Sequence, residues 1–158
     1  LVFDGSNRIE VPIGELIHGH CHGNLDKSLI IGIRVPHIND GSSGIFMKYG
    51  VRHAIDFAFS NVGIRFTPEK DGGEPASIAV VVGAVAIEPV RLEETENAVL
   101  MALNGGKVDK ERIYTLAQKE LQSRSAMIRE FTVSLKGKQN ALLIIVDALR
   151  AFFNALGR

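Results

Sequence analysis

The stretch that decides the fold is Ile78-Ala79-Val80-Val81-Val82-Gly83-Ala84-Val85-Ala86-Ile87-Glu88-Pro89-Val90-Arg91-Leu92-Glu93-Glu94-Thr95-Glu96. Its first part, residues 78–87, is apolar and rich in β-branched residues, as expected of a buried strand. After Pro89 the spacing of apolar residues changes from two to about 3.6, which indicates a helix. The chain therefore passes here from a sheet-forming half to a helix-forming half.

Two further strands are expected before this stretch, at residues 45–49 and 54–66. The polar, glycine-rich residues 67–75 connect the second of them to the strand at residues 78–87. A connection of this kind joins neighbouring antiparallel strands. The three strands are therefore predicted to form an antiparallel meander.

Three helices are expected after Pro89. Asn104-Gly105-Gly106 ends the first, because glycine readily adopts the left-handed conformation that closes a helix. Asp109 begins the second, and the third covers residues 139–156. Apolar residues three or four positions apart mark one face of each helix: Leu92, Ala98, Val99, Ala102 and Leu103, then Ile113, Leu116, Ala117 and Leu121, then Leu142, Leu143, Val146, Leu149, Phe152 and Phe153. Three helices on one face of the sheet give an α+β fold.

The beginning of the chain predicts strands of a different sheet. Residues 1–3 and 8–11 flank the turn-forming Asp4-Gly5-Ser6-Asn7, which indicates a β-hairpin. Residues 28–35 predict another strand, and Pro36 ends it because proline has no backbone N–H to donate. These strands need a larger sheet to be stable.

A boundary is expected near residue 40. Residues 37–44 include Asn39-Asp40-Gly41-Ser42-Ser43-Gly44, all turn or linker formers. They divide the chain into regions 1–40 and 41–158. Because Leu1 already belongs to strand-like sequence, we also expect further residues upstream of it.

Composition narrows the class of protein. The 158 residues are 46% hydrophobic, with 18 basic and 18 acidic side chains, so the chain can bury a core and has no net charge to attract nucleic acid or an acidic membrane. Cys21 is the only cysteine, which excludes an intrachain disulfide. We find no signal peptide and no apolar run long enough to cross a bilayer, so a cytoplasmic protein is expected.

Two motifs give the chain a family resemblance. Lys48-Tyr49-Gly50-Val51-Arg52-His53-Ala54-Ile55-Asp56 resembles the K-(F/Y)-G-x-R-x-A-x-D segment of the FAD subunits of molybdenum hydroxylases. Gly83 to Glu96 is similar to that family's G-(A/G)-V-A-x-x-P-x-R-(A/L)-x-x-x-E segment, at the expected distance downstream. The family includes the medium subunit of carbon monoxide dehydrogenase, bacterial xanthine dehydrogenase, nicotinate dehydrogenase and 4-hydroxybenzoyl-CoA reductase.

The resemblance implies a fold and a domain order. Residues 24–36 resemble the strand that ends the family's FAD-binding domain, so region 1–40 would be the end of that domain. Region 41–158 would be the C-terminal domain of a CO dehydrogenase flavoprotein, with a three-stranded antiparallel sheet packed against three helices. Residues 123–131 depart from the family's S-x-x-R-x-S-x-x-Y-R pattern, which puts the usual subunit contacts in doubt.

The resemblance also implies cofactors and partners. The whole subunit would bind FAD and relay electrons between [2Fe–2S] clusters and an external acceptor. Partner subunits would be a large one with molybdopterin and a small iron–sulfur one, and a homo-oligomer is possible. The family's phosphate-binding glycine loops precede the part matching Leu1, so this stretch alone would not hold the flavin. The alternative is a non-redox interaction module that scaffolds partner subunits.

Ile30 and Lys48 are the residues that the resemblance assigns to the cofactor site. Ile30 matches an apolar residue in the wall of the FAD site. Lys48 matches a lysine near the flavin, where an ammonium group would favour the negative charge of reduced flavin. On its own pattern, Lys48 would be an ordinary surface lysine at a strand end. Arg52, His53 and Asp56 follow in a loop that would lie close to the flavin. Alternatively, Arg52 and Asp56 simply pair or cap a strand end.

Two other segments have a plain and a functional interpretation. His18-Gly19-His20-Cys21-His22 has four potential metal ligands, but no second cluster follows, so a connecting loop is favoured over a zinc site. Residues 141–146 are apolar all round, which favours a buried helix over a subunit interface. We assign no metal and no catalytic residue.

Overall fold

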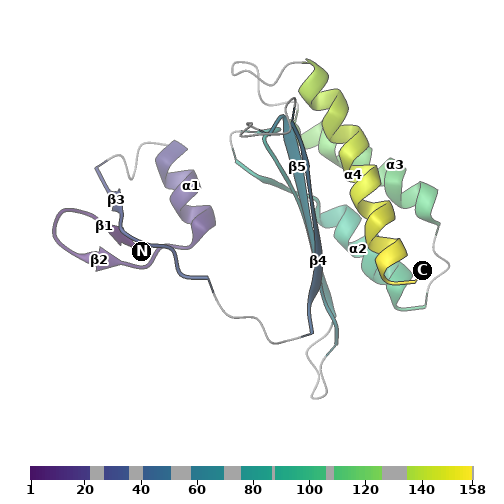
Figure 1. Cartoon of the computed structure of the whole chain (residues 1–158), viewed down its shortest axis with the longest axis horizontal. Coiled ribbons are helices and arrows are strands. Elements are labelled where there is room, and N and C mark those ends of the chain that lie inside the picture. Colours follow the sequence, from purple (N-terminus) through teal and green to yellow (C-terminus); the bar gives the residue numbers. More distant parts are fainter. Residues whose placement is uncertain are drawn as a thin grey trace. The chain divides into compact units, whose positions relative to one another are not determined.

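The structure, a computed structural model of the whole chain, describes residues 1–21, 27–35, 41–50, 58–69, 76–86, 88–105, 109–125 and 135–157. The chain divides into an N-terminal unit, Leu1–Ile38, and a C-terminal unit, Asn39–Arg158 (Figure 1). Each unit has its own sheet, and each is described by itself.

The sheet of the N-terminal unit has three short antiparallel strands. They are β1 (Val2–Phe3), β2 (Arg8–Ile9) and β3 (Leu29–Ile30), in the order β2-β1-β3. The predicted hairpin is confirmed, and the Asp4 carboxylate stabilises its turn by accepting the backbone N–H of Ser6 and of Asn7, at 2.9 and 2.8 Å. The strand predicted at residues 28–35 is shorter than expected, because its partner β1 offers only two residues for pairing.

A helix in this unit corrects one prediction. Residues 18–21 of the histidine cluster belong to α1 (Ile13–Cys21) and not to a connecting loop, and His22 lies outside the described residues. The helix begins just after Pro12, whose carbonyl accepts the Leu16 N–H at 2.9 Å. Its two glycines, Gly14 and Gly19, weaken the helical signal in the sequence.

The C-terminal unit contains a four-stranded antiparallel sheet. Its strands are β4 (Ser43–Tyr49), β5 (Ser60–Thr67), β6 (Ser77–Gly83) and β7 (Val90–Arg91), in that order across the sheet. The predicted meander is confirmed, and its connections keep sequence neighbours side by side.

Three details of this sheet differ from prediction. β7 is an additional strand, too short to show any periodicity in the sequence. β6 ends at Gly83 rather than at residue 87, because Ala84 has a φ of 62° and leaves the extended conformation. β4 already begins at Ser43, within the predicted linker. Residues 54–57 of the predicted second strand lie outside the described residues.

Three helices cover one face of this sheet, as predicted (Figure 1). They are α2 (Glu93–Leu103), α3 (Lys110–Ser125) and α4 (Leu135–Ala155). The expected signals act at their ends: Gly105 has a φ of 97° after α2, and Asp109 accepts the Arg112 N–H at 3.1 Å before α3. None of the helices in the described ranges is both long enough and apolar enough to span a bilayer.

The core lies between the sheet and the helices. Every second residue of β5 and β6 points into it: Val62, Ile64, Ile78, Val80 and Val82. Helix α4 supplies the largest share on the other side, with Ala141, Ile144, Ile145, Val146, Ala148, Leu149, Phe152 and Phe153. The apolar run at residues 141–146 is therefore mainly a core face, with Leu143 as its exposed member at 62%.

Leu149 and Leu143 allow a matched test of this packing. Leu149 is fully buried, so Leu149→Ala is expected to lower the free energy of unfolding by about 2 to 5 kcal/mol. Leu143→Ala, the same change on the same helix, should cost less than about 0.5 kcal/mol. Urea unfolding followed by circular dichroism measures both. Equal losses for the two variants would contradict the assigned helix face.

Candidate functional site

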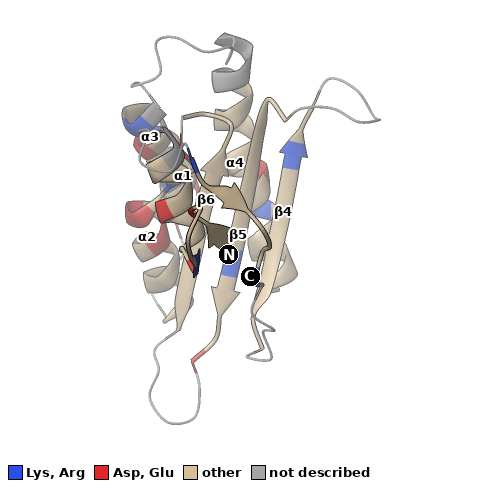
Figure 2. Ribbon diagram, turned by 90° about the vertical axis from the view of Figure 1, so that its left-hand side faces the viewer, with Lys and Arg blue, Asp and Glu red and all other residues tan. Residues whose placement is uncertain are grey.

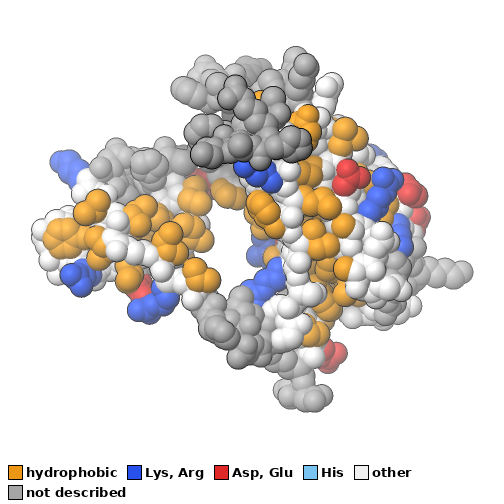
Figure 3. Space-filling view, viewed as in Figure 1, with side chains coloured by type: hydrophobic (Ala, Val, Ile, Leu, Met, Phe, Trp, Pro, Cys, Tyr) orange, Lys and Arg blue, Asp and Glu red, His pale blue; other side chains and the backbone are white. Residues whose placement is uncertain are grey.

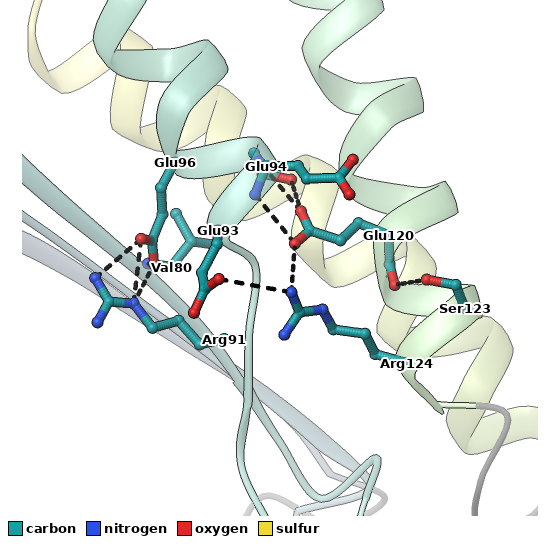
Figure 4. A network of polar contacts seen from close by, with 9 residues as sticks. Val80, Arg91, Glu93, Glu94, Glu96, Glu120, Ser123 and Arg124 are labelled. Atoms are coloured by element: carbon teal, nitrogen blue, oxygen red, sulfur yellow. Dashed lines mark hydrogen bonds and ion pairs between the residues drawn. The ribbon is translucent and has the colours of Figure 1, made fainter.

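Arg91 and Glu96, the charged pair of the second motif, form a structural contact. The Glu96 carboxylate is 7% exposed and accepts two hydrogen bonds from the Arg91 Nε and one from its Nη2, at 2.8, 3.1 and 2.9 Å (Figure 4). It also accepts the backbone N–H of Val80 in β6 at 2.8 Å. The hydrogen bonds to Glu96 raise the pKa of the Arg91 guanidinium above its ordinary value. This pair therefore joins α2 to the sheet.

A second buried carboxylate, Glu120, was not anticipated. It comes from α3 and accepts the backbone N–H of Glu94 at 3.1 Å and of Thr95 at 2.9 Å, and also the Thr95 hydroxyl at 2.8 Å (Figure 4). Arg124 lies 3.5 Å from the same carboxylate. Glu120 thus accepts hydrogen bonds from backbone N–H groups in the first turn of α2, where the N-cap residue Leu92 has no side-chain acceptor. A signal was present, since Glu120 lies beside Leu121 on the apolar face of α3.

Removing the Glu120 carboxylate should destabilise the unit. Glu120→Ala leaves two backbone N–H groups and a hydroxyl without their acceptor, and we expect a loss of about 3 kcal/mol in the free energy of unfolding. Glu111→Ala, at an exposed position of the same helix, is the control. Thermal and urea unfolding measure the difference, and similar values for both variants would disprove the capping role.

The candidate site lies on the opposite side of the sheet, which we call the distal face. Because side chains alternate along a strand, the residues between the core positions point away from the helices. On the distal face these are Phe46, Lys48, Asn61, Gly63, Arg65, Ala79, Val81 and Gly83. The four strands carry three basic side chains, of which Arg91 is paired with Glu96 of α2, and, in their described residues, no Asp or Glu (Figure 2). Gly63 and Gly83, on the two central strands, have no side chain to rise above this face.

Lys48 belongs to a row of three residues across the distal face. It is directly opposite Asn61 of β5, which is directly opposite Gly83 of β6. A side chain at position 83 would collide with Asn61, because a Cβ there would lie 2.5 Å from the Asn61 Oδ1 and 3.1 Å from its Nδ2. The structure therefore adds Asn61 to the site, a residue that sequence reasoning missed.

An apolar groove runs along the outer edge of β4. Met47, Lys48 and Tyr49 line it from β4, and Asn140, Leu143, Ile144 and Asp147 line it from α4, around a volume of about 410 Å³. Hydrophobic side chains follow this edge in Figure 3. Lys48 therefore borders both this groove and the distal face.

The remaining predicted residues belong to the other unit or lie outside the described residues. Ile30 lies in β3 of the N-terminal unit, opposite Val2, and is exposed. A site shared by Ile30 and Lys48 stays a prediction, since they belong to different units. Arg52, His53 and Asp56 lie outside the described residues. In the described part of the chain, no three His, Cys, Asp or Glu side chains are grouped to hold a metal ion.

Known proteins resemble this chain in fold and not in sequence. No protein-family model matches the chain, and no curated protein matches it in sequence. Solved structures do share its fold, and three of them are CO dehydrogenases.

One such structure is CO dehydrogenase from Hydrogenophaga pseudoflava, in a form lacking the Mo-pyranopterin moiety of the molybdenum cofactor. It has a TM-score of 0.56 and 22% identity over 79% of this chain and 41% of that one. Reconstituted CO dehydrogenase from Oligotropha carboxidovorans gives 0.56 and 18% over 78% and 41%. A cyanide-inactivated Cu,Mo-CO dehydrogenase gives 0.50 and 17% over 70% and 36%. This chain thus has the fold of about two-fifths of a CO dehydrogenase chain.

Proposed function

We propose that the chain is part of the FAD subunit of a molybdenum hydroxylase, which relays electrons between iron–sulfur clusters and an external acceptor. The observation that carries the proposal is the fold that this chain shares with two CO dehydrogenase structures, over about two-fifths of the length of each matched chain. The two sequence motifs point to the same enzymes independently. In this proposal residues 1–40 end the FAD-binding domain and residues 41–158 are the C-terminal domain.

The residues of the distal face fit a flavin. An isoalloxazine is flat and has polar groups along its pyrimidine edge, and this face is lowered by Gly63 and Gly83 and carries Lys48 and Asn61 in one row. Bound flavin supplies the capacity to accept and release electrons. The Lys48 ammonium would favour negative charge on the ring, and Ile30 would supply part of the apolar wall.

The proposal includes partners and a location. Substrate oxidation would take place at molybdenum in a large subunit, and a small subunit would hold the [2Fe–2S] clusters. The assembly would be cytoplasmic, with a homo-oligomer as one possibility. This chain's own role would be to position the flavin and set its charge environment, without a catalytic residue for the substrate.

A second candidate is a non-redox module that scaffolds partner subunits. Exposed apolar side chains favour it: Ile33 and Val35 are 80% and 79% exposed in the N-terminal unit, and Phe46 is 68% exposed on β4. Such side chains often belong to interfaces.

The flavin content of the purified protein distinguishes the two candidates. The intact gene product, isolated with its partner subunits from the source cell, should release FAD into solution on denaturation, where its fluorescence identifies it. A fully folded complex that releases no FAD would reject the redox proposal and favour the scaffold.

Lys48 gives a sharper test. Lys48→Gln should lower the midpoint potential of the flavin by about 20 to 90 mV, because a charge about 4 Å away is worth about 1 to 4 kcal/mol and about 30 mV corresponds to about 1.4 kcal/mol for two electrons. Spectroscopic redox titration measures it. Lys119→Gln removes the same charge at an exposed position of α3 and is the control. An unchanged potential in Lys48→Gln would remove Lys48 from the site.

A further inference from the structure

The Asn61 carboxamide lies over its neighbour on β6, Gly83. A Cβ at Gly83 would lie 3.1 Å from the Asn61 Cγ as well as 2.5 Å from its Oδ1, so the carboxamide occupies the space above the Gly83 Cα. At Gly63, on the same face, a Cβ would meet nothing within 4 Å. The need for glycine at position 83 therefore arises from Asn61 and not from crowding of the whole face.

The carboxamide keeps its hydrogen-bonding capacity available. No hydrogen bond joins the Asn61 side chain to another residue in the described part of the chain. An Asn side chain presents two N–H donors and a carbonyl acceptor in one plane. A polar group that lies over the sheet and is not used by the fold is available to bind a ligand.

The composition of the row narrows the ligand chemistry. Directly opposed residues on antiparallel strands have Cβ atoms about 4.5 to 5.5 Å apart. The Lys48 and Asn61 side chains thus leave the same face of the sheet from directly opposed positions on neighbouring strands. A planar donor and acceptor beside a cation match an imide edge, in which a carbonyl oxygen neighbours an N–H group, as carboxamides match base edges in nucleic acids.

We infer that Asn61 is a cofactor-contacting residue that binds the imide edge of the isoalloxazine, donating to a ring carbonyl and accepting the N3–H. This inference rests on the proposed function. Gly83 acts through Asn61, because it allows the carboxamide to lie flat across β6. Lys48 sets the charge beside the ring, and Asn61 sets the orientation of the ring.

A cycle of variants and cofactor analogues tests the contact. The intact gene product is stripped of flavin and titrated with FAD and with N3-methyl-FAD, which lacks the N3–H donor. Wild type should bind N3-methyl-FAD about tenfold more weakly than FAD. Asn61→Ala should bind FAD about tenfold more weakly than wild type does, and should no longer distinguish the two flavins. Flavin fluorescence gives the dissociation constants.

Gly83→Ala and Gly63→Ala are the matched pair for the positioning role. Gly83→Ala displaces the carboxamide and should reproduce the lost discrimination of Asn61→Ala while Asn61 itself remains. Gly63→Ala adds the same methyl group where space is open and should keep the discrimination. Far-ultraviolet circular dichroism verifies that each variant is folded.

The outcomes separate this inference from the proposed function. A wild-type protein that binds no flavin overturns both. Flavin binding in which Asn61→Ala still discriminates against N3-methyl-FAD overturns only the role of Asn61. Equal loss of discrimination in Gly83→Ala and Gly63→Ala overturns the role assigned to Gly83.

Discussion

Glu96 provides the contact on which the C-terminal unit depends, because it completes hydrogen bonding that the sheet leaves unfinished. β7 pairs only with Val81 and Val82, so the Val80 N–H has no strand partner and binds the Glu96 carboxylate instead. A buried N–H left without an acceptor costs about 1 to 3 kcal/mol. Since Glu96 is in the first turns of α2, the same bond fixes where that helix lies. Glu120 then fixes α3 against α2, and the core is closed on one side of the sheet.

Periodicity predicts most of this unit, because its long elements each bury one face. The change of spacing after Pro89 correctly separates the sheet from the helices, and Gly105 and Asp109 mark helix ends through local backbone preferences. The failures are of another kind. β7 is too short for a period, and the glycines of α1 hide the helix from a reading based on helix propensity.

The candidate site is predictable only in part. A motif identifies Lys48, and alternation along β4 then gives its face. Asn61 is different, because its importance comes from lying against Gly83, 22 positions away, and that contact exists only in one strand register. Ile30, which the resemblance assigns to the same site, stays a prediction, because it belongs to the other unit.

The position of β4 at the end of the sheet has a consequence unrelated to any cofactor. No strand among the described residues pairs with the outer side of this seven-residue strand, and an exposed edge of that kind invites strands of other molecules to add and build fibrils. A lysine in an edge strand opposes this growth, because stacking would bring like charges together in a dry environment. Lys48 is therefore placed where its charge opposes the addition of further strands.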